Sequence, residues 1–154
     1  FTTDILLGVL IEHGFGDLAY RLISSDAPGS YLWMKRRGAT TIYEFPDGGG
    51  SHFHPAFGAP ARHIFSGFAG IRQASGKEGY AYKSISIHPV FPEGLNRLSA
   101  SISTESGVIS VKWEKQGTSA QLEIDIPENS DAVFSYNGTE LSLNKGLNKL
   151  QINL

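Results

Sequence analysis

A carboxylate and two imidazoles lie close together in the segment from Gly38 to His54, which reads Gly-Ala-Thr-Thr-Ile-Tyr-Glu-Phe-Pro-Asp-Gly-Gly-Gly-Ser-His-Phe-His. Carboxylate and imidazole side chains can transfer protons or bind ligands. The β-type residues of 40–43 predict an extended piece that ends at Glu44. The proline and glycines after Glu44 predict a flexible loop that returns with His52 and His54. This pattern favours a site in which a scaffold fixes a carboxylate beside a loop.

Two other interpretations of this segment stay open. A glutamate beside a tyrosine is commonly a solvated surface residue, and a glycine-rich run is commonly only a turn. A metal site of His52, His54 and Asp47 is a weaker alternative, because no third nitrogen or sulfur ligand is evident. The remaining histidines are interpreted as helix-end or surface residues: His13, His63 and His88.

The composition describes an ordinary globular chain of 154 residues, because 40% hydrophobic residues can build a packed core. A net charge of −2 gives no support for a nucleic-acid partner or an anionic membrane. No apolar run approaches the roughly 20 residues that span a bilayer. The absence of cysteine excludes a disulfide framework and a thiolate nucleophile, and it identifies no compartment. Without an initial Met or a signal-peptide pattern, the chain is expected to be a piece of a longer protein.

The first half of the chain is predicted to be helical. Apolar residues at helical spacing cover much of the circumference of residues 4–13, which predicts a helix buried on several sides. A second helix is predicted over residues 17–24, with Leu18, Leu22 and Ala19 as the candidates to face inward. Such helices cannot close a core by themselves, so we expect them to be the last part of a larger helical array. Their exposed apolar faces predict self-association of this piece.

Less regular structure is predicted between and after these helices. Tyr31 and Trp33 are expected in short extended pieces around Gly38. A further helix is predicted to begin near Pro55, or properly at Pro60, because proline suits only the first turn of a helix.

From about Tyr80 the hydrophobic pattern changes to alternation, which is typical of strands with one buried face. Asn137-Gly138 indicates a type I′ hairpin turn. The alternating or β-type runs lie at 85–87, 98–102, 111–113, 122–126, 132–136, 139–143 and 147–154. Short strands with regular turns predict an antiparallel β-sandwich. A composition shift near Ser75-Gly76 predicts the domain boundary, so the fold class is α+β with domains 1–75 and 76–154.

Several motifs of this chain resemble the C-terminal part of bacterial α-L-rhamnosidases, which are glycoside hydrolases. They are Glu12-His13-Gly14 with Gly16-Asp17-Leu18-Ala19-Tyr20-Arg21-Leu22, Gly-Ala-Thr-Thr-Ile-aromatic-Glu at 38–44, Ser-His-x-His-Pro-x-Phe-Gly at 51–58, Phe68-Ala69-Gly70-Ile71, and Ile85-Ser86-Ile87-His88-Pro89-Val90. The resemblance covers nearly the whole chain, and the motif at 38–44 is its most specific part. It implies that residues 1–75 are the last helices and active-site loop of an (α/α)6 catalytic barrel, followed by a C-terminal β-sandwich.

The resemblance also implies roles for individual residues. Glu44 matches the general base of an inverting hydrolase that removes terminal α-L-rhamnose, and His54 matches a histidine that contacts the sugar. Tyr43 stands where the family usually has tryptophan, and it can still stack on a sugar face. His52 is expected to help bind the substrate. Phe45-Pro46 replaces the usual Arg-Trp or Tyr-Trp, so the pocket differs here. No cofactor or metal is implied.

An inverting site needs two carboxyl groups about 6.5–9.5 Å apart, one to protonate the leaving oxygen and one to activate water on the opposite face. The family's general acid lies on an earlier segment that this chain does not contain. We therefore expect the chain to be inactive by itself. Its expected partners are a rhamnose-containing oligosaccharide or glycoside and the missing N-terminal part of the same polypeptide.

A non-catalytic carbohydrate-binding or structural β-sandwich is the alternative function. Trp33 and Trp113 could offer a surface on which a sugar stacks. An aromatic residue in an alternating strand is more often part of the core, and Trp113 lies on the apolar side of its run.

Overall fold

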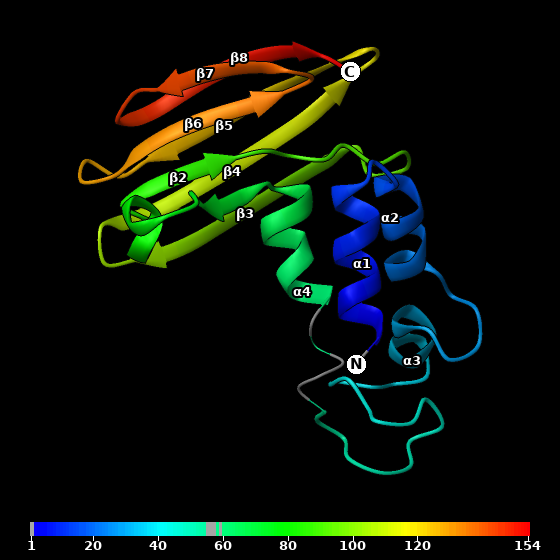
Figure 1. Ribbon diagram of the computed structural model, residues 1–154. Helices are drawn as coiled ribbons and strands as arrows, with labels where there is room; N and C mark the ends of the chain where they lie inside the picture. Colours follow the sequence, from blue (N-terminus) through cyan, green and yellow to red (C-terminus); the bar gives the residue numbers. More distant parts are fainter. Residues whose placement is uncertain (1, 55–57, 59) are drawn as a thin grey trace. The chain divides into compact units, whose positions relative to one another are not determined.

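A computed structural model describes residues 2–54, 58 and 60–154, which fall into two compact units, residues 1–63 and 64–154. The first unit is helical and the second consists of two β-sheets (Figure 1). Among the residues that the structure describes, no helix combines the length and the apolar character that a membrane span requires.

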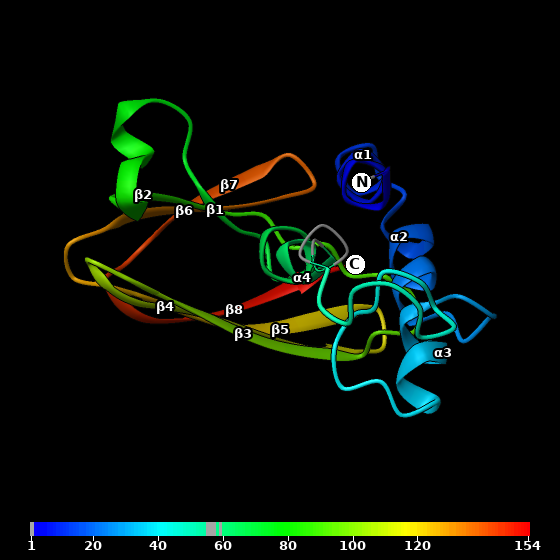
Figure 2. The ribbon, with the colours of Figure 1, turned by 90° about the horizontal axis from the view of Figure 1, so that it is seen from below.

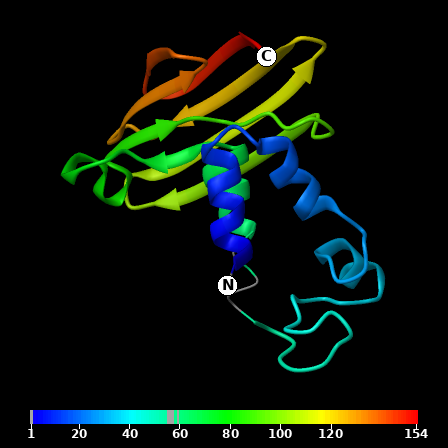
Figure 3. The ribbon, with the colours of Figure 1, turned by 45° about the vertical axis from the view of Figure 1, so that its right-hand side comes forward.

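The described residues of the first unit include the α-helices α1 (Thr2–Glu12), α2 (Gly16–Ser24), α3 (Tyr31–Arg36) and α4 (Pro60–His63). Helix α1 packs against α2 and α4, and α2 packs against α3. Figure 3 shows α1 in blue beside the green turn of α4, and the long cyan loop that follows α3. The small core of this unit contains Leu7, Ile11, Ala19 and Met34.

The first two helices lie where the sequence predicts helices. Gly14 has φ of +82° and follows the end of α1, a conformation that glycine adopts without steric cost. The predicted inward direction of Leu18 and Leu22 was wrong, since their side chains are 38% and 40% exposed. Ala19, the third inward-facing candidate, is fully buried, and the small residue Gly16 is buried as well.

The prediction of extended pieces around Gly38 was also wrong. Tyr31 and Trp33 lie in α3, because the Ser30 hydroxyl accepts a 3.2 Å hydrogen bond from the Trp33 N–H and caps the helix. Residues 40–43 form part of a loop and not a strand, and the main-chain carbonyl of Ile42 pairs with the returning half of that loop. Helix α4 begins at Pro60, one of the two predicted starts. The other, near Pro55, lies outside the described residues.

The second unit contains two four-stranded sheets, which Figure 2 shows as two layers. The first sheet has the order β1 (Ile71–Gln73), β2 (Ser84–Ile87), β6 (Asp131–Tyr136) and β7 (Thr139–Leu143). The second has the order β3 (Arg97–Thr104), β4 (Gly107–Gln116), β5 (Ser119–Ile126) and β8 (Gly146–Asn153). These strands confirm the predicted β-sandwich.

One strand pair departs from the predicted antiparallel arrangement. Strands β2 and β6 are parallel, with Ser84 opposite Asp131 and Ile87 opposite Phe134. Between them the chain builds β3, β4 and β5 in the other sheet, and such a long crossover allows it to return in the same direction. The remaining pairs are antiparallel. At the β6–β7 turn, Asn137 and Gly138 both have positive φ, 46° and 76°, as the type I′ prediction requires.

The sandwich core contains the alternate residues that the sequence pattern selects. Val111 and Ile124 are fully buried and pair across β4 and β5. Lys112 and Glu123, which form the next pair along these strands, are exposed. The segment before β1 also belongs to this unit. It contains a short π-helix, η2 (Ile64–Phe68), and the side chains of Phe68 and Ala69 are buried. The chain thus divides into its two compact units between residues 63 and 64, and the domain boundary at 75/76 stays a prediction.

Candidate functional site

The loop of residues 41–54 brings the predicted site residues together on two facing legs. The Glu44 N–H donates to the Ser51 carbonyl at 2.8 Å, and the His54 N–H donates to the Ile42 carbonyl at 3.2 Å. The Thr41 hydroxyl also donates to the His52 carbonyl. The outgoing leg thus carries Tyr43 and Glu44, and the returning leg carries His52 and His54.

The carboxylate of Glu44 is tied to the facing leg. Its Oε2 accepts a 3.0 Å hydrogen bond from the Ser51 N–H. Glu44 and Ser51 therefore share two hydrogen bonds, one through the Glu44 main chain and one through its side chain. A charged acceptor on a backbone donor makes one of the stronger hydrogen bonds in proteins, so this contact orients the half-buried carboxylate.

The loop needs glycine at position 50. Gly50 has φ of +68°, and a Cβ built there would lie 2.7 Å from Oε2 of Glu44 and 2.9 Å from Cδ2 of Phe45. Asp47 supports the turn from the other side, because its Oδ1 accepts a 3.0 Å hydrogen bond from the Gly49 N–H. The flexible loop predicted from the Pro-Asp-Gly-Gly-Gly run is thus held by specific local hydrogen bonds.

Tyr43 and His52 stack on each other across the two legs. Their ring centroids are 4.3 Å apart and the ring planes are inclined by 25°. Nε2 of His52 donates to the Gly48 carbonyl at 2.8 Å, because a carbonyl can only accept. One face of the Tyr43 ring is therefore covered by His52, and only the other face can meet a ligand.

The described residues contain no group of three or more His, Asp or Glu side chains arranged to hold a metal ion. His52 and Asp47 instead bond to main-chain atoms of the loop. The metal alternative for this loop thus gains no support from the geometry.

The other three histidines differ from one another. His13 is exposed beyond the end of α1, and His88 is exposed with its Nδ1 2.9 Å from the Ser135 hydroxyl. His63 is the last residue of α4, which agrees with the helix-end interpretation, but at 5% exposure it is buried and is not a surface residue. It is buried because its ring bonds to Asp4, which lies 59 positions earlier in the chain. No local sequence pattern signals a pair so far apart.

The sandwich has a hollow of about 600 Å³ on the sheet that contains β3, β4 and β5. Its polar lining includes Arg97, Lys112, Glu114, Gln121, Glu123 and Lys149. Trp113 is only 2% exposed and its ring meets Phe91 edge-on at 5.0 Å, which confirms that it belongs to the core. It therefore offers no stacking surface for a sugar. Trp33 is half-buried in the helical unit, with the Arg37 guanidinium 4.7 Å from its ring centroid.

Both halves of the chain match known sequence families. Residues 1–67 match the bacterial α-L-rhamnosidase 6 hairpin glycosidase domain, and residues 70–150 match the bacterial α-L-rhamnosidase C-terminal domain. An α-L-rhamnosidase of Formosa agariphila is 30% identical over 141 residues, a match that covers 84% of this chain and 15% of the relative. The chain thus spans only about 15% of the length of that relative.

Two solved structures have the same fold over nearly the whole chain. The α-L-rhamnosidase of Aspergillus terreus gives a TM-score of 0.87 at 21% identity, covering 97% of this chain and 19% of that one. The Streptomyces avermitilis α-L-rhamnosidase complexed with L-rhamnose gives a TM-score of 0.84 at 22% identity, and the match covers 98% of this chain and 17% of that one. The order of helices and sandwich agrees with the predicted fold class, the last helices of an (α/α)6 barrel followed by a β-sandwich. The chain therefore belongs to the bacterial α-L-rhamnosidase family of glycoside hydrolases.

Proposed function

We propose that the loop of residues 41–54 forms the general-base side of an active site that releases terminal α-L-rhamnose with inversion, and that Glu44 is the base. The observation that carries this proposal is the hydrogen bond of 3.0 Å from the Ser51 N–H to Oε2 of Glu44. A base must present one oxygen to one water molecule, and this bond fixes the direction of the carboxylate. Family membership supplies the reaction class.

In the proposed reaction, the ionised carboxylate of Glu44 takes a proton from a water molecule. The water oxygen forms the new bond to the anomeric carbon while the bond to the leaving oxygen breaks on the opposite face. A general acid outside this chain gives that leaving oxygen its proton. Oε2 is engaged by Ser51, so we assign the contact with water to Oε1.

Substrate binding in this proposal falls to the other predicted residues. His54 binds a sugar hydroxyl from the returning leg, where its main-chain N–H is fixed to Ile42. Tyr43 offers a sugar the ring face that His52 leaves uncovered, and His52 acts by holding that ring in place. L-Rhamnose as the bound sugar is supported by the related Streptomyces avermitilis structure, which is a complex with L-rhamnose.

The helices of this chain also point to further helices of the same domain. Ile5 and Val9 of α1 are 68% and 48% exposed, although both are large and apolar. Exposed apolar faces of this kind commonly mark an interface. We infer that in the parent polypeptide these faces pack against other hairpins of the glycosidase domain, and that the chain without them is inactive and self-associates.

The experiment compares two loop variants of the parent enzyme on an aryl α-L-rhamnoside. Glu44→Gln should lower kcat by about two to four orders of magnitude, the usual contribution of a general base. Asp47→Asn is the matched control, because it neutralises a carboxylate of the same loop that serves only the turn. It should retain most of the activity. Equal activity of the two variants would contradict the assignment, as would Glu44-dependent turnover by the purified 154-residue chain.

A further inference from the structure

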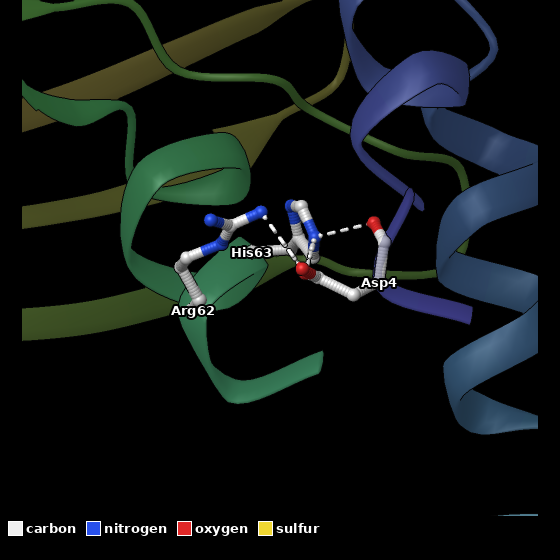
Figure 4. A network of polar contacts seen from close by, with 3 residues as sticks. All are labelled: Asp4, Arg62 and His63. Carbon is white, nitrogen blue, oxygen red and sulfur yellow. Dashed lines mark hydrogen bonds and ion pairs between the residues drawn. The ribbon is translucent and has the colours of Figure 1, made fainter. Parts of the chain in front are cut away.

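His63 is a buried histidine at the end of α4 with no role in the proposed chemistry. Its Nε2 lies 2.7 Å from Oδ1 of Asp4 and 3.0 Å from the Asp4 carbonyl oxygen (Figure 4). Both partner atoms can only accept, so Nε2 carries the hydrogen and donates it to them. The contact joins the first turn of α1 to the last residue of α4.

The carboxylate of Asp4 also forms an ion pair with Arg62, the residue before His63. Nη2 of Arg62 lies 3.0 Å from Oδ1 and 3.1 Å from Oδ2 of Asp4. The Arg62 side chain is 65% exposed, whereas that of His63 is 6% exposed, so solvent screens the arginine contact far more. The histidine bond is therefore the part of this network that holds α4 in place.

Helix α1 is shaped to receive the His63 ring. Gly8 lies one turn after Asp4 and thus on the same side of the helix. A Cβ at Gly8 would lie 3.3 Å from Cε1 of His63, closer than an ordinary van der Waals contact. Glycine costs a helix interior roughly 0.5–1 kcal/mol relative to alanine, so its presence here is explained by the approach of the ring.

This contact lies directly downstream of the candidate site loop. Within the described part of the chain, the main-chain hydrogen bonds of residues 41–54 join the two legs of this loop to each other. The elements at its two ends therefore help to set the orientation of the loop. Pro60, the first residue of α4, follows His54 after a short segment, and the Asp4 bond fixes α4 to α1. We propose that Asp4 and His63 are a positioning pair, which sets the place of the loop that carries Glu44 and His54. This inference rests on the function proposed above.

The test uses the parent enzyme with Asp4→Ala and His63→Ala, each alone and together. Each single variant should lower kcat for an aryl α-L-rhamnoside by roughly ten- to a hundredfold, because small displacements of positioned groups cost this much. The double variant should be no worse than either single one, since both remove the same contact. His63→Gln, whose amide can donate to the same carboxylate, should restore part of kcat. Arg62→Gln is the matched control and should stay close to the wild type.

Hydrogen exchange of residues 41–54 gives a readout that is independent of catalysis. Both alanine variants should exchange faster in this loop, while the strands of the sandwich stay as protected as in the wild type. If His63→Ala does not fold, Asp4→Ala alone decides the question. Unchanged kcat and unchanged loop exchange in a folded variant would overturn the positioning pair. Faster loop exchange in an enzyme whose activity is insensitive to Glu44→Gln would instead overturn the proposed function and leave the pair intact.

Discussion

The indole nitrogen of Trp113 donates a 2.9 Å hydrogen bond to the backbone carbonyl of Phe68, 45 positions earlier in the chain. Both side chains are only 2% exposed, so the bond is shielded from water. Gly70 adds a close approach nearby, because a Cβ there would lie 2.2 Å from the carbonyl carbon of His88. The segment 64–70 is thus an integral part of the sandwich, although no strand passes through it.

Removing this segment should destabilise the sandwich. A chain that begins at Ile64 should give a β-rich far-UV circular dichroism spectrum and unfold cooperatively in urea. A chain that begins at Tyr80 lacks the buried Phe68 and Ile71, and the loss of two such side chains should cost at least about 3 kcal/mol in the free energy of unfolding. In the longer chain, Trp113→Phe should cost about 1–3 kcal/mol in the free energy of unfolding, because the buried hydrogen bond from the indole N–H to the Phe68 carbonyl is then lost. Equal stability of the two chains would show that the segment is dispensable.

Alanine substitutions at two glycines of the site loop can distinguish the effect of backbone strain from the effect of a steric clash with the Glu44 carboxylate. Gly48 and Gly50 have φ of +94° and +68°, so alanine at either position costs about 1–2 kcal/mol. A Cβ at Gly48 meets nothing within 4 Å, whereas one at Gly50 meets Oε2 of Glu44. In the parent enzyme, Gly50→Ala should therefore lower kcat by about tenfold or more, and Gly48→Ala should lower mainly stability. Identical kinetics for both variants would argue against a role for the orientation of Glu44.

Burial raises the pKa of Tyr31 above its ordinary value of 10.0, and a hydrogen bond with Thr3 opposes the shift. Because the folded state favours the neutral phenol, the contribution of Tyr31 to the free energy of unfolding is fully present below the ordinary pKa. It is lost as the pH rises through the raised folded value. The Tyr31→Phe variant has no ionisable group at position 31. As the pH rises above 10, the free energy of unfolding of this variant should therefore fall less than that of the wild type. Urea unfolding at several pH values measures the difference, and Tyr80→Phe, at a 74% exposed side chain, should behave like the wild type.

The exposed apolar face of α1 should make the 154-residue chain self-associate. Ile5→Lys places a charge at a 68% exposed position of that face and should shift the sedimentation profile toward the monomer. Val108→Lys is the control, because Val108 is 56% exposed but belongs to the sandwich. A wild-type chain that stays monomeric at high concentration would contradict the predicted self-association.

The sandwich could be predicted because the signals for its strands and turns lie in short stretches of sequence. Alternation selects Ile124 and Ile126 for the core, where they are 0% and 1% exposed, and the Asn137-Gly138 pair requires the turn that it forms. The parallel pairing of β2 with β6 could not be predicted, because strand order depends on the path of the whole chain. Helix α3 was missed because the aromatic residues after Ser30 favour strands, and the cap at Ser30 overrides that preference.

The candidate site follows the same division. That Glu44, His52 and His54 share one loop follows from their closeness in sequence. The Ser51 contact with the carboxylate depends on how the loop folds back on itself, and the Asp4–His63 bond depends on how α4 returns to α1. Neither relationship has a local signal, which is why the burial of His63 at the end of α4 was not predicted. The roles of Glu44, His54, Tyr43 and His52 remain predictions.

Chemical rescue of Glu44→Ala in the parent enzyme tests the central claim most directly. Removal of the base should lower hydrolysis of an aryl α-L-rhamnoside by about two to four orders of magnitude. Azide is a small nucleophile that needs no base, so it should enter the vacated space and restore release of the aryl group. The product should be the β-L-rhamnosyl azide, inverted like the hydrolysis product of the wild type. A near-normal rate for Glu44→Ala without azide, or retention of configuration by the wild-type enzyme, would contradict Glu44 as the base of an inverting site.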